Sequence, residues 1–289
     1  IPLKPMGGQK FKHKLNHILF FPYNFKKIKS CLEQSNFIHF RAPTGIGVLL
    51  LPWIYMFWKK NIWIKYAGSW EDSSSPITYK LQRWYLKKFQ KNAKISLNGN
   101  YPELSNNFYK FINPCFNQKT LDEAKAIARK KTFKGRLNLL FVGRLEKEKG
   151  LDDLFKLIES ENNRKNIQSL TIIGGSKYQK KYLDWASNLA LDIQFCGPLP
   201  RHEVFKHYSN SQILILLSKS EGFPKVIMEA GAFGCVPIIS DLKEIKYVIK
   251  DNINGFILEN DPNHINKRFS KVPSDPQSLK FCSKNISKE

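Results

Sequence analysis

Residues 220–230 read Ser-Glu-Gly-Phe-Pro-Lys-Val-Ile-Met-Glu-Ala and follow an apolar run of strand length, Ile213 to Leu217. Pro224 suits the first position of a helix, because its fixed φ is helical and its missing N–H is no loss there. The stretch therefore predicts a strand, a bare turn and a helix. It places two carboxylates, Glu221 and Glu229, at one edge of a sheet, where open α/β sheets bind ligands.

Gly222 carries no side chain beside the predicted helix start, so a phosphate oxygen could approach the backbone N–H groups while the helix dipole favours its charge. Carboxylates repel a phosphate and are better suited to accept hydrogen bonds from hydroxyl groups, those of a sugar for Glu221 and of a ribose for Glu229. A nucleotide sugar offers both. The alternative is that both glutamates are ordinary, one near a helix dipole and one solvated on a helix.

A second block begins with the apolar run Leu137 to Val142. The loop Gly-Arg-Leu-Glu-Lys-Glu-Lys-Gly follows at 143–150, ahead of a helical pattern that starts at Leu151. An arginine forks onto phosphate oxygens, whereas a lysine adds a compact charge. Taken alone, Arg144 and Lys149 fit a solvated loop equally well.

Between the two blocks, short apolar runs alternate with helical patterns. The strands expected are 169–174, 192–196 and 212–217, and the helices expected are 178–190 and 201–209. Such alternation predicts right-handed βαβ units and a parallel sheet.

In combination, these motifs resemble the C-terminal half of GT-B glycosyltransferases, in particular the retaining, family 4-like group 1 enzymes of bacterial polysaccharide synthesis. The resemblance rests on two glutamates with seven residues between them, on Gly234 and Pro237-Ile238-Ile239, and on the 143–150 loop. It implies an α/β GT-B fold, in which two Rossmann-like domains with parallel sheets face a cleft.

The resemblance also implies roles for individual residues. Glu221 would hold the donor sugar hydroxyls, and Arg144 and Lys149 would offset charge on the leaving diphosphate; these are the catalytic candidates. The donor-binding candidates are Gly143, Gly197, Leu199, Gly222, Phe223, Pro224 and Glu229. Gly197 and Leu199 would lie against the nucleobase, with a plain turn as the alternative.

The first half predicts a further βαβ series. Residues 36–47 read as a strand that runs into a glycine turn, and residues 61–70 repeat this plan. Their sequences resemble polysaccharide glycosyltransferases of the same group, which makes four residues acceptor-side candidates: Arg41, Thr44, Gly68 and Trp70. The alternative is that the glycines only turn the chain.

Two domains are expected: an acceptor-side Rossmann-like domain at 1–135 and a nucleotide-sugar-binding one at 136–289. Only two clear strands precede Lys94, and the chain does not begin with Met. A full Rossmann-like domain needs more strands, so the N-terminal domain is expected to be incomplete.

Positive charge is concentrated in the first half. The net charge is +23 at pH 7, and residues 1–135 hold 24 Lys and Arg against 6 Asp and Glu. A basic acceptor domain suits an anionic membrane that carries a lipid-linked acceptor. The alternative is a solvated, lysine-rich surface. Nucleic acid is not expected, because the sequence contains no motif that binds it.

The most apolar stretch, Gly47 to Trp58, is too short for a bilayer, which needs about 20 residues. It predicts a buried helix, with interfacial insertion as the alternative. Five scattered cysteines indicate a reducing cytosol. The cysteines and histidines show no metal-binding spacing, so neither a metal nor a cofactor is expected besides the nucleotide-diphosphate sugar substrate.

The function expected is transfer of a sugar from a nucleotide-diphosphate donor to a glycan or lipid-linked acceptor, with retention, in surface polysaccharide synthesis. The location expected is cytoplasmic, with peripheral contact at the inner face of an anionic membrane. Two alternatives stay open: a GT-B sugar-nucleotide epimerase, and an inactive, truncated binding module.

Overall fold

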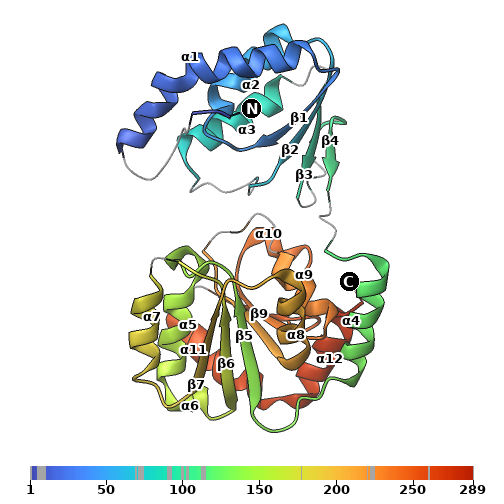
Figure 1. The fold of residues 1–289 in the computed structure, drawn as a ribbon. Helices are drawn as coiled ribbons and strands as arrows, with labels where there is room; N and C mark the ends of the chain where they lie inside the picture. Colours follow the sequence, from blue (N-terminus) through green and yellow to red (C-terminus); the bar gives the residue numbers. More distant parts are fainter. Residues whose placement is uncertain are drawn as a thin grey trace. The chain divides into compact units, whose positions relative to one another are not determined.

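Two parallel sheets organise the chain in a computed structural model (Figure 1). The structure describes residues 2–4, 11–68, 70, 75–89, 93–98, 101, 104–111, 115–176, 178–219, 221, 225–259 and 261–288. The chain divides into two compact units, Ile1–Ile112 (unit 1) and Asn113–Glu289 (unit 2). Both units confirm the predicted α/β class.

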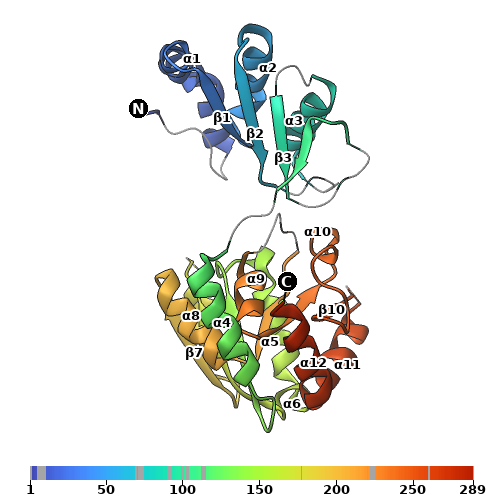
Figure 2. The same cartoon turned by 90° about the vertical axis from the view of Figure 1, so that its right-hand side faces the viewer.

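Unit 1 contains a four-stranded parallel sheet in the order β1-β2-β3-β4. Its strands are β1 Phe37–Ala42, β2 Asn61–Tyr66, β3 Ala93–Leu97 and β4 Phe108–Lys110, and its helices are α1 Phe11–Glu33, α2 Gly47–Phe57 and α3 Ile77–Lys88. The strands β1, β2 and β3 follow one another across the sheet. Right-handed crossovers that advance in one direction place α2 and α3 on the same face (Figure 2).

The core of unit 1 lies between that face and the helices. Alternate residues of the strands point into it, such as Ile38 in β1 and Ile64 in β2, while their neighbours point the other way. Helix α1 packs on the same side, because the Phe25 ring meets the Trp53 ring of α2 edge-on at 4.9 Å.

The predicted buried helix is α2, and only one side of it is buried. Leu50, Leu51 and Ile54 are in the core, whereas Met56 and Phe57 at its C-terminal end are 65% and 63% exposed. None of the helices that the structure describes is long and apolar enough to cross a membrane.

Unit 2 contains a six-stranded parallel sheet in the order β10-β9-β8-β5-β6-β7. Its strands are β5 Leu137–Val142, β6 Ile167–Ile173, β7 Asp192–Gly197, β8 Ile213–Leu216, β9 Val236–Ser240 and β10 Phe256–Leu258. Its helical segments are α4 Gln118–Lys130, η1 Lys147–Lys149, α5 Leu151–Glu159, α6 Glu161–Arg164, α7 Gln179–Ala186, α8 Arg201–Asn210, α9 Lys225–Ala232, α10 Lys243–Lys246, α11 Pro262–Lys271, η2 Val272–Ser274 and α12 Pro276–Ile286.

The central strands of unit 2 are covered on both faces. Every residue of β8 and β9 is buried, which is the pattern of a parallel sheet between two helix layers. The chain moves outward from β5 through β6 to β7, then returns to β8 and moves the other way through β9 to β10. The switch point of the sheet therefore lies between β5 and β8.

The division of the structure into compact units falls earlier than the boundary expected after residue 135, because the second unit begins at Asn113. Helix α4 packs against α8, α9 and α12, and its Ala124 is fully buried in the unit 2 core. The ammonium of Lys131 donates to the carbonyl oxygens of Tyr208 and Ser209 at 2.8 and 3.0 Å. Burial lowers the pKa of Lys131. Periodicity could not reveal these contacts, since they link residues far apart in sequence.

Candidate functional site

The two loops with the sequence motifs lie side by side at the switch point. Gly150 has φ 72°, and a Cβ on it would stand 1.8 Å from the carbonyl oxygen of Leu217. The backbone N–H of Lys219 donates to the carbonyl oxygen of Glu148 at 2.9 Å. These contacts dock η1 on the chain just after β8, and only glycine allows the approach at position 150.

Docking of η1 brings Lys149 and Glu221 together. The ammonium of Lys149 donates to Glu221 Oε1 at 2.6 Å, and the hydroxyl of Ser218 donates to the same oxygen at 2.7 Å. The side chains of the pair are 21% and 9% exposed. Removal of one partner would leave a largely buried charge, which is more costly than loss of an exposed pair.

Arg144 lies on the same sheet edge, two residues after the end of β5, but its side chain faces solvent. Its guanidinium contacts Glu146 at 3.0 Å, and its side chain is 70% exposed. Such an exposed pair contributes little to stability. The guanidinium can therefore turn to a ligand at small cost.

Glycines line the carboxyl ends of β5, β6 and β7. The N–H of Gly143 donates to the carbonyl oxygen of Ile173, and that of Gly174 donates to the carbonyl oxygen of Gly197, both at 2.9 Å. A Cβ on Gly174 would stand 1.8 Å from the carbonyl oxygen of Gly143. The sheet edge is thus bare backbone over three strands. Leu199, beyond the last of them, is partly buried against the core.

Glu229 lies on α9, with its side chain 11% exposed and both oxygens engaged. The Nη2 and Nε atoms of Arg201 donate to Oε1 at 2.9 and 3.1 Å, and the Tyr208 hydroxyl donates to Oε2 at 3.3 Å. Burial and the Glu229 charge raise the pKa of Tyr208, so this hydroxyl remains a proton donor.

Arg201 and Tyr208, which contact the Glu229 carboxylate, are not among the residues that the sequence singled out. The guanidinium of Arg201 lies over the rings of Phe116 and Phe205, 5.5 and 5.2 Å from their centroids. Arg201 is the first residue of α8, directly after the Gly197-Pro198-Leu199-Pro200 loop. Its place beside a predicted nucleobase loop was the one available signal.

A cavity of about 380 Å³ opens where β8, β9 and β10 end. Polar groups of Asp153, Ser218, Lys219 and Ser240 line it, together with apolar residues of the same strands and of α11. Its size and mixed lining are those of a small-molecule pocket.

The acceptor-side candidates all belong to unit 1. Gln82 of α3 holds both backbone groups of Thr44: its Nε2 donates to the Thr44 carbonyl at 2.9 Å, and its Oε1 accepts from the Thr44 N–H at 3.2 Å. A Cβ on Gly68 would be 3.1 Å from the Pro43 ring. Arg41 is exposed, whereas Trp70 is 4% exposed in the core. Their contact with an acceptor stays a prediction.

Gly222, Phe223 and Pro224 lie outside the described residues, so the predicted helix start is described only from Lys225 onward. Among the residues that the structure does describe, no group of three or more His, Cys, Asp or Glu side chains could hold a metal ion.

A family model matches the second part of this chain. The glycosyl transferases group 1 model covers residues 122–289, which include the whole edge described above. The chain belongs to this family. The match begins within α4, so it supports the assignment of that helix to unit 2.

Curated relatives of this chain include proteins named as glycosyltransferases. An uncharacterized 41.2 kDa protein in the cps region of Klebsiella pneumoniae is 28% identical over 150 residues, which are 49% of this chain and 38% of that protein. D-inositol 3-phosphate glycosyltransferase of Thermobifida fusca is 24% identical over 151 residues, 48% of this chain and 35% of that enzyme. The matches thus span less than half the length of these relatives.

Solved structures of other proteins share the fold of this chain. Sucrose-phosphate synthase from Thermosynechococcus elongatus has a TM-score of 0.70 at 18% identity, over 99% of this chain and 76% of that one. Anabaena HepE in complex with UDP-glucose has a TM-score of 0.69 at 12% identity, over 100% and 80%. These likenesses confirm the GT-B fold predicted from the sequence.

Proposed function

We propose that this group 1 glycosyltransferase moves a sugar from a nucleotide-diphosphate donor to a glycan or lipid-linked acceptor, with retention as in the family 4-like enzymes. The observation that carries the proposal is the Lys149–Glu221 pair at the switch point of unit 2, at 2.6 Å. An anion-binding lysine and a hydroxyl-binding carboxylate stand there beside a bare glycine edge. A sugar diphosphate needs both kinds of group.

The charges and hydrogen-bond donors of Lys149 and Arg144 suggest their roles. Lys149 has three N–H donors and uses one on Glu221, so it can bind a donor phosphate without release of the carboxylate. Arg144 adds a fork for the same phosphates. Together they stabilise the negative charge that develops on the leaving diphosphate, which is a principal electrostatic task in group transfer. The proposal therefore includes no metal ion.

The nucleoside would lie toward β7 and α8. Gly197 and Leu199 present backbone to the base, and Glu229 accepts from the ribose hydroxyls. Arg201 and Tyr208 hold the Glu229 carboxylate in place before the nucleotide arrives. A carboxylate has about four lone-pair positions, so acceptor capacity remains for a ribose.

Relatives suggest which donor and product to try first. HepE was crystallised with UDP-glucose, and the Klebsiella relative comes from a cps region. A uridine diphosphate sugar and a surface polysaccharide are therefore the first donor and product to test.

We extend the proposal to peripheral contact with the inner face of an anionic membrane, at the C-terminal end of α2. The exposed Met56 and Phe57 are followed by Lys59 and Lys60. Apolar tips beside cations suit the boundary between headgroups and acyl chains. Flotation with phosphatidylglycerol vesicles tests this contact, and equal flotation of a Met56→Glu/Phe57→Glu variant would exclude it.

A thermal-shift panel of UDP, GDP and ADP tests the donor site. We expect one diphosphate to raise the melting temperature more than the other two. Product analysis with and without added acceptor then separates the activities, because an epimerase converts its nucleotide sugar without an acceptor. A shift without any product would favour the inactive binding module, and no shift with any nucleotide would contradict the proposal.

A further inference from the structure

Glu229 lies where three helices of unit 2 pack together. Helices α4, α8 and α9 contact one another in pairs, and α4 lies beside α8 in Figure 2. Glu229 is on α9, and Arg201 is the first residue of α8. Cys115 and Phe116 lie just ahead of α4 and outside residues 122–289, which the family model covers. The family match therefore assigns no role to these two residues.

The segment ahead of α4 contacts the first residue of each of the other two helices. The Phe116 ring centroid is 5.5 Å from the guanidinium carbon of Arg201, at the start of α8. The Cys115 thiol is 4.0 Å from the carbonyl oxygen of Lys225, at the start of α9. Burial and the Glu229 charge raise the pKa of this thiol, so the segment also lies within the field of the carboxylate.

The start of α4 holds Phe116 in place. Asn117 caps this helix, because its side-chain oxygen accepts from the backbone N–H of Thr120 at 2.9 Å. The Phe116 ring packs on the core of unit 2, 5.4 Å from the Phe205 ring and 6.1 Å from the Phe233 ring. Both the backbone and the ring of Phe116 are thus fixed by neighbouring contacts.

Two aromatic rings support the Arg201 guanidinium. It lies 5.5 Å from the Phe116 centroid and 5.2 Å from the Phe205 centroid, where the face of each ring attracts a cation. The Arg201 side chain is 54% exposed, and an exposed arginine ordinarily loses rotamer freedom when it forms an ion pair. The rings restrict that freedom in advance. They favour the conformation in which Nε and Nη2 both donate to Glu229.

On the basis of the proposed function, in which Glu229 accepts from the ribose, we propose that Phe116 and Phe205 are positioning residues for ribose recognition. They hold Arg201 where it orients the Glu229 carboxylate. Arg201 donates to one carboxylate oxygen and Tyr208 donates to the other, which restricts rotation of the carboxylate. An acceptor that is oriented in advance loses less freedom when a ligand binds. Loss of either ring therefore weakens recognition of the ribose hydroxyls, whereas contacts with the phosphates are unchanged.

The test compares UDP with dideoxy-UDP, which lacks both ribose hydroxyls, by calorimetric titration into the full chain. The matching guanosine or adenosine pair is used if the thermal-shift panel selects that base. We expect wild type to bind the hydroxylated nucleotide about tenfold more tightly. Phe116→Leu and Phe205→Leu keep an apolar side chain without the ring, and each should lower this preference to about threefold. Phe116→Tyr keeps the ring and should retain the wild-type preference.

A second comparison shows whether the ring acts through Arg201. Arg201→Ala alone should lower the preference to about threefold, and Phe116→Leu added to it should lower the preference no further. Phe155→Leu is the matched control, because Phe155 is a buried phenylalanine of the same core whose ring contacts Tyr182 and Trp185. This control should retain the wild-type preference. Circular dichroism checks that each variant folds, and either ring variant suffices if the other does not.

Three results would overturn the assignment of the two rings and leave the proposed function standing. They are a wild-type preference that both ring variants retain, an equal effect of Phe116→Leu with and without Arg201, and an equal effect of Phe155→Leu. Equal binding of UDP and dideoxy-UDP by wild type is a different outcome. It would contradict the ribose role of Glu229 and, with it, the role of the rings.

Discussion

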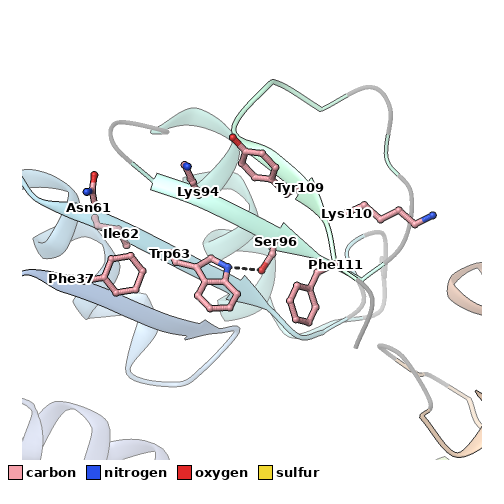
Figure 3. A pocket seen from close by; sticks show the side chains of 9 residues that line it. All are labelled: Phe37, Asn61, Ile62, Trp63, Lys94, Ser96, Tyr109, Lys110 and Phe111. Carbon is pink, nitrogen blue, oxygen red and sulfur yellow. Dashed lines mark hydrogen bonds between the residues drawn. The ribbon is translucent and has the colours of Figure 1, made fainter. Parts of the chain in front are cut away.

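The two sheets of this chain differ in what their faces are made of. In unit 2, β8 and β9 are buried at every position, and the polar chemistry is confined to the carboxyl edge. In unit 1, β1 and β2 alternate between a buried apolar face and a more exposed face with aromatic and basic groups. The comparison shows that unit 2 gathers its polar groups at one edge of its sheet, whereas unit 1 carries aromatic and basic groups on a face of its sheet (Figure 3).

The largest loss of stability is expected at Gly150, where two backbone segments of unit 2 approach each other most closely. Gly150→Ala would place Cβ against the Leu217 carbonyl in a left-handed conformation, so we expect a loss of about 3 kcal/mol or more. Gly135→Ala is the control, because Gly135 has the same sign of φ, 73°, with nothing within 4 Å. It should cost only about 1 kcal/mol. Urea unfolding measures both, and equal losses would show that the collision is absent.

The second effect concerns ligand binding at the same edge. Arg144→Ala should lower sugar transfer about 100-fold, through loss of charge stabilisation on the diphosphate. It should leave folding unchanged, because the side chain is exposed. Lys147→Ala is the control, since Lys147 is an exposed lysine in the same loop. An Arg144→Ala enzyme with full transfer activity would remove this residue from the site.

In unit 1, we expect a loss of stability when the contact between α3 and the turn after β1 is removed. Gln82 is 1% exposed and bonds Thr44 and Thr78, so Gln82→Ala leaves backbone groups without partners. We expect a loss of about 2 kcal/mol. Gln34→Ala, at an exposed position, should stay within about 0.5 kcal/mol. Hydrogen exchange should rise at Thr44, just after β1, for the first variant alone; unchanged exchange there would contradict the assigned tether.

The smallest effect is expected at the N-terminus of α12 in unit 2. Asp275 accepts from the hydroxyl and the backbone N–H of Ser278, and these bonds hold its pKa below the ordinary value of 3.8. Asp275→Ala should cost about 1 kcal/mol near neutral pH. Because the folded-state pKa is lowered, the difference should persist above pH 3.8 and vanish as pH falls through the lowered pKa. A difference independent of pH would exclude the charged cap.

The contrast between the sheets of the two units also explains which features could be predicted from the sequence. Unit 2 could be predicted because its strands are mostly apolar, above all β8, and because its site motifs lie in the loops that follow them, as with Lys149 and Glu221. The Arg201–Glu229 contact could not be predicted, since it joins residues of two different helices, α8 and α9. The sequence also could not predict that Trp70 is buried or that α4 belongs to unit 2. Both features depend on which distant residues pack together.

In unit 1, the sequence pattern did not show which side chains gather on the more exposed face of the sheet. The alternation in β1 is compatible with a solvated face, and only the structure shows that one hollow is lined by Trp63, Phe111, Lys94 and Lys110 (Figure 3). These residues come from β2, β3, β4 and the position after β4, which are separate segments of the sequence.

The central claim is that the carboxyl edge of unit 2 binds a nucleoside diphosphate, with Glu229 on the ribose. Calorimetric titration of the nucleotide selected by the thermal-shift panel into wild type, Arg201→Ala and Glu229→Gln tests it most directly. The account predicts saturable binding to wild type and about tenfold weaker binding to Glu229→Gln, a loss of about 1.4 kcal/mol, with a smaller loss for Arg201→Ala. Equal affinity of wild type and Glu229→Gln, or no binding of any nucleoside diphosphate, would contradict it.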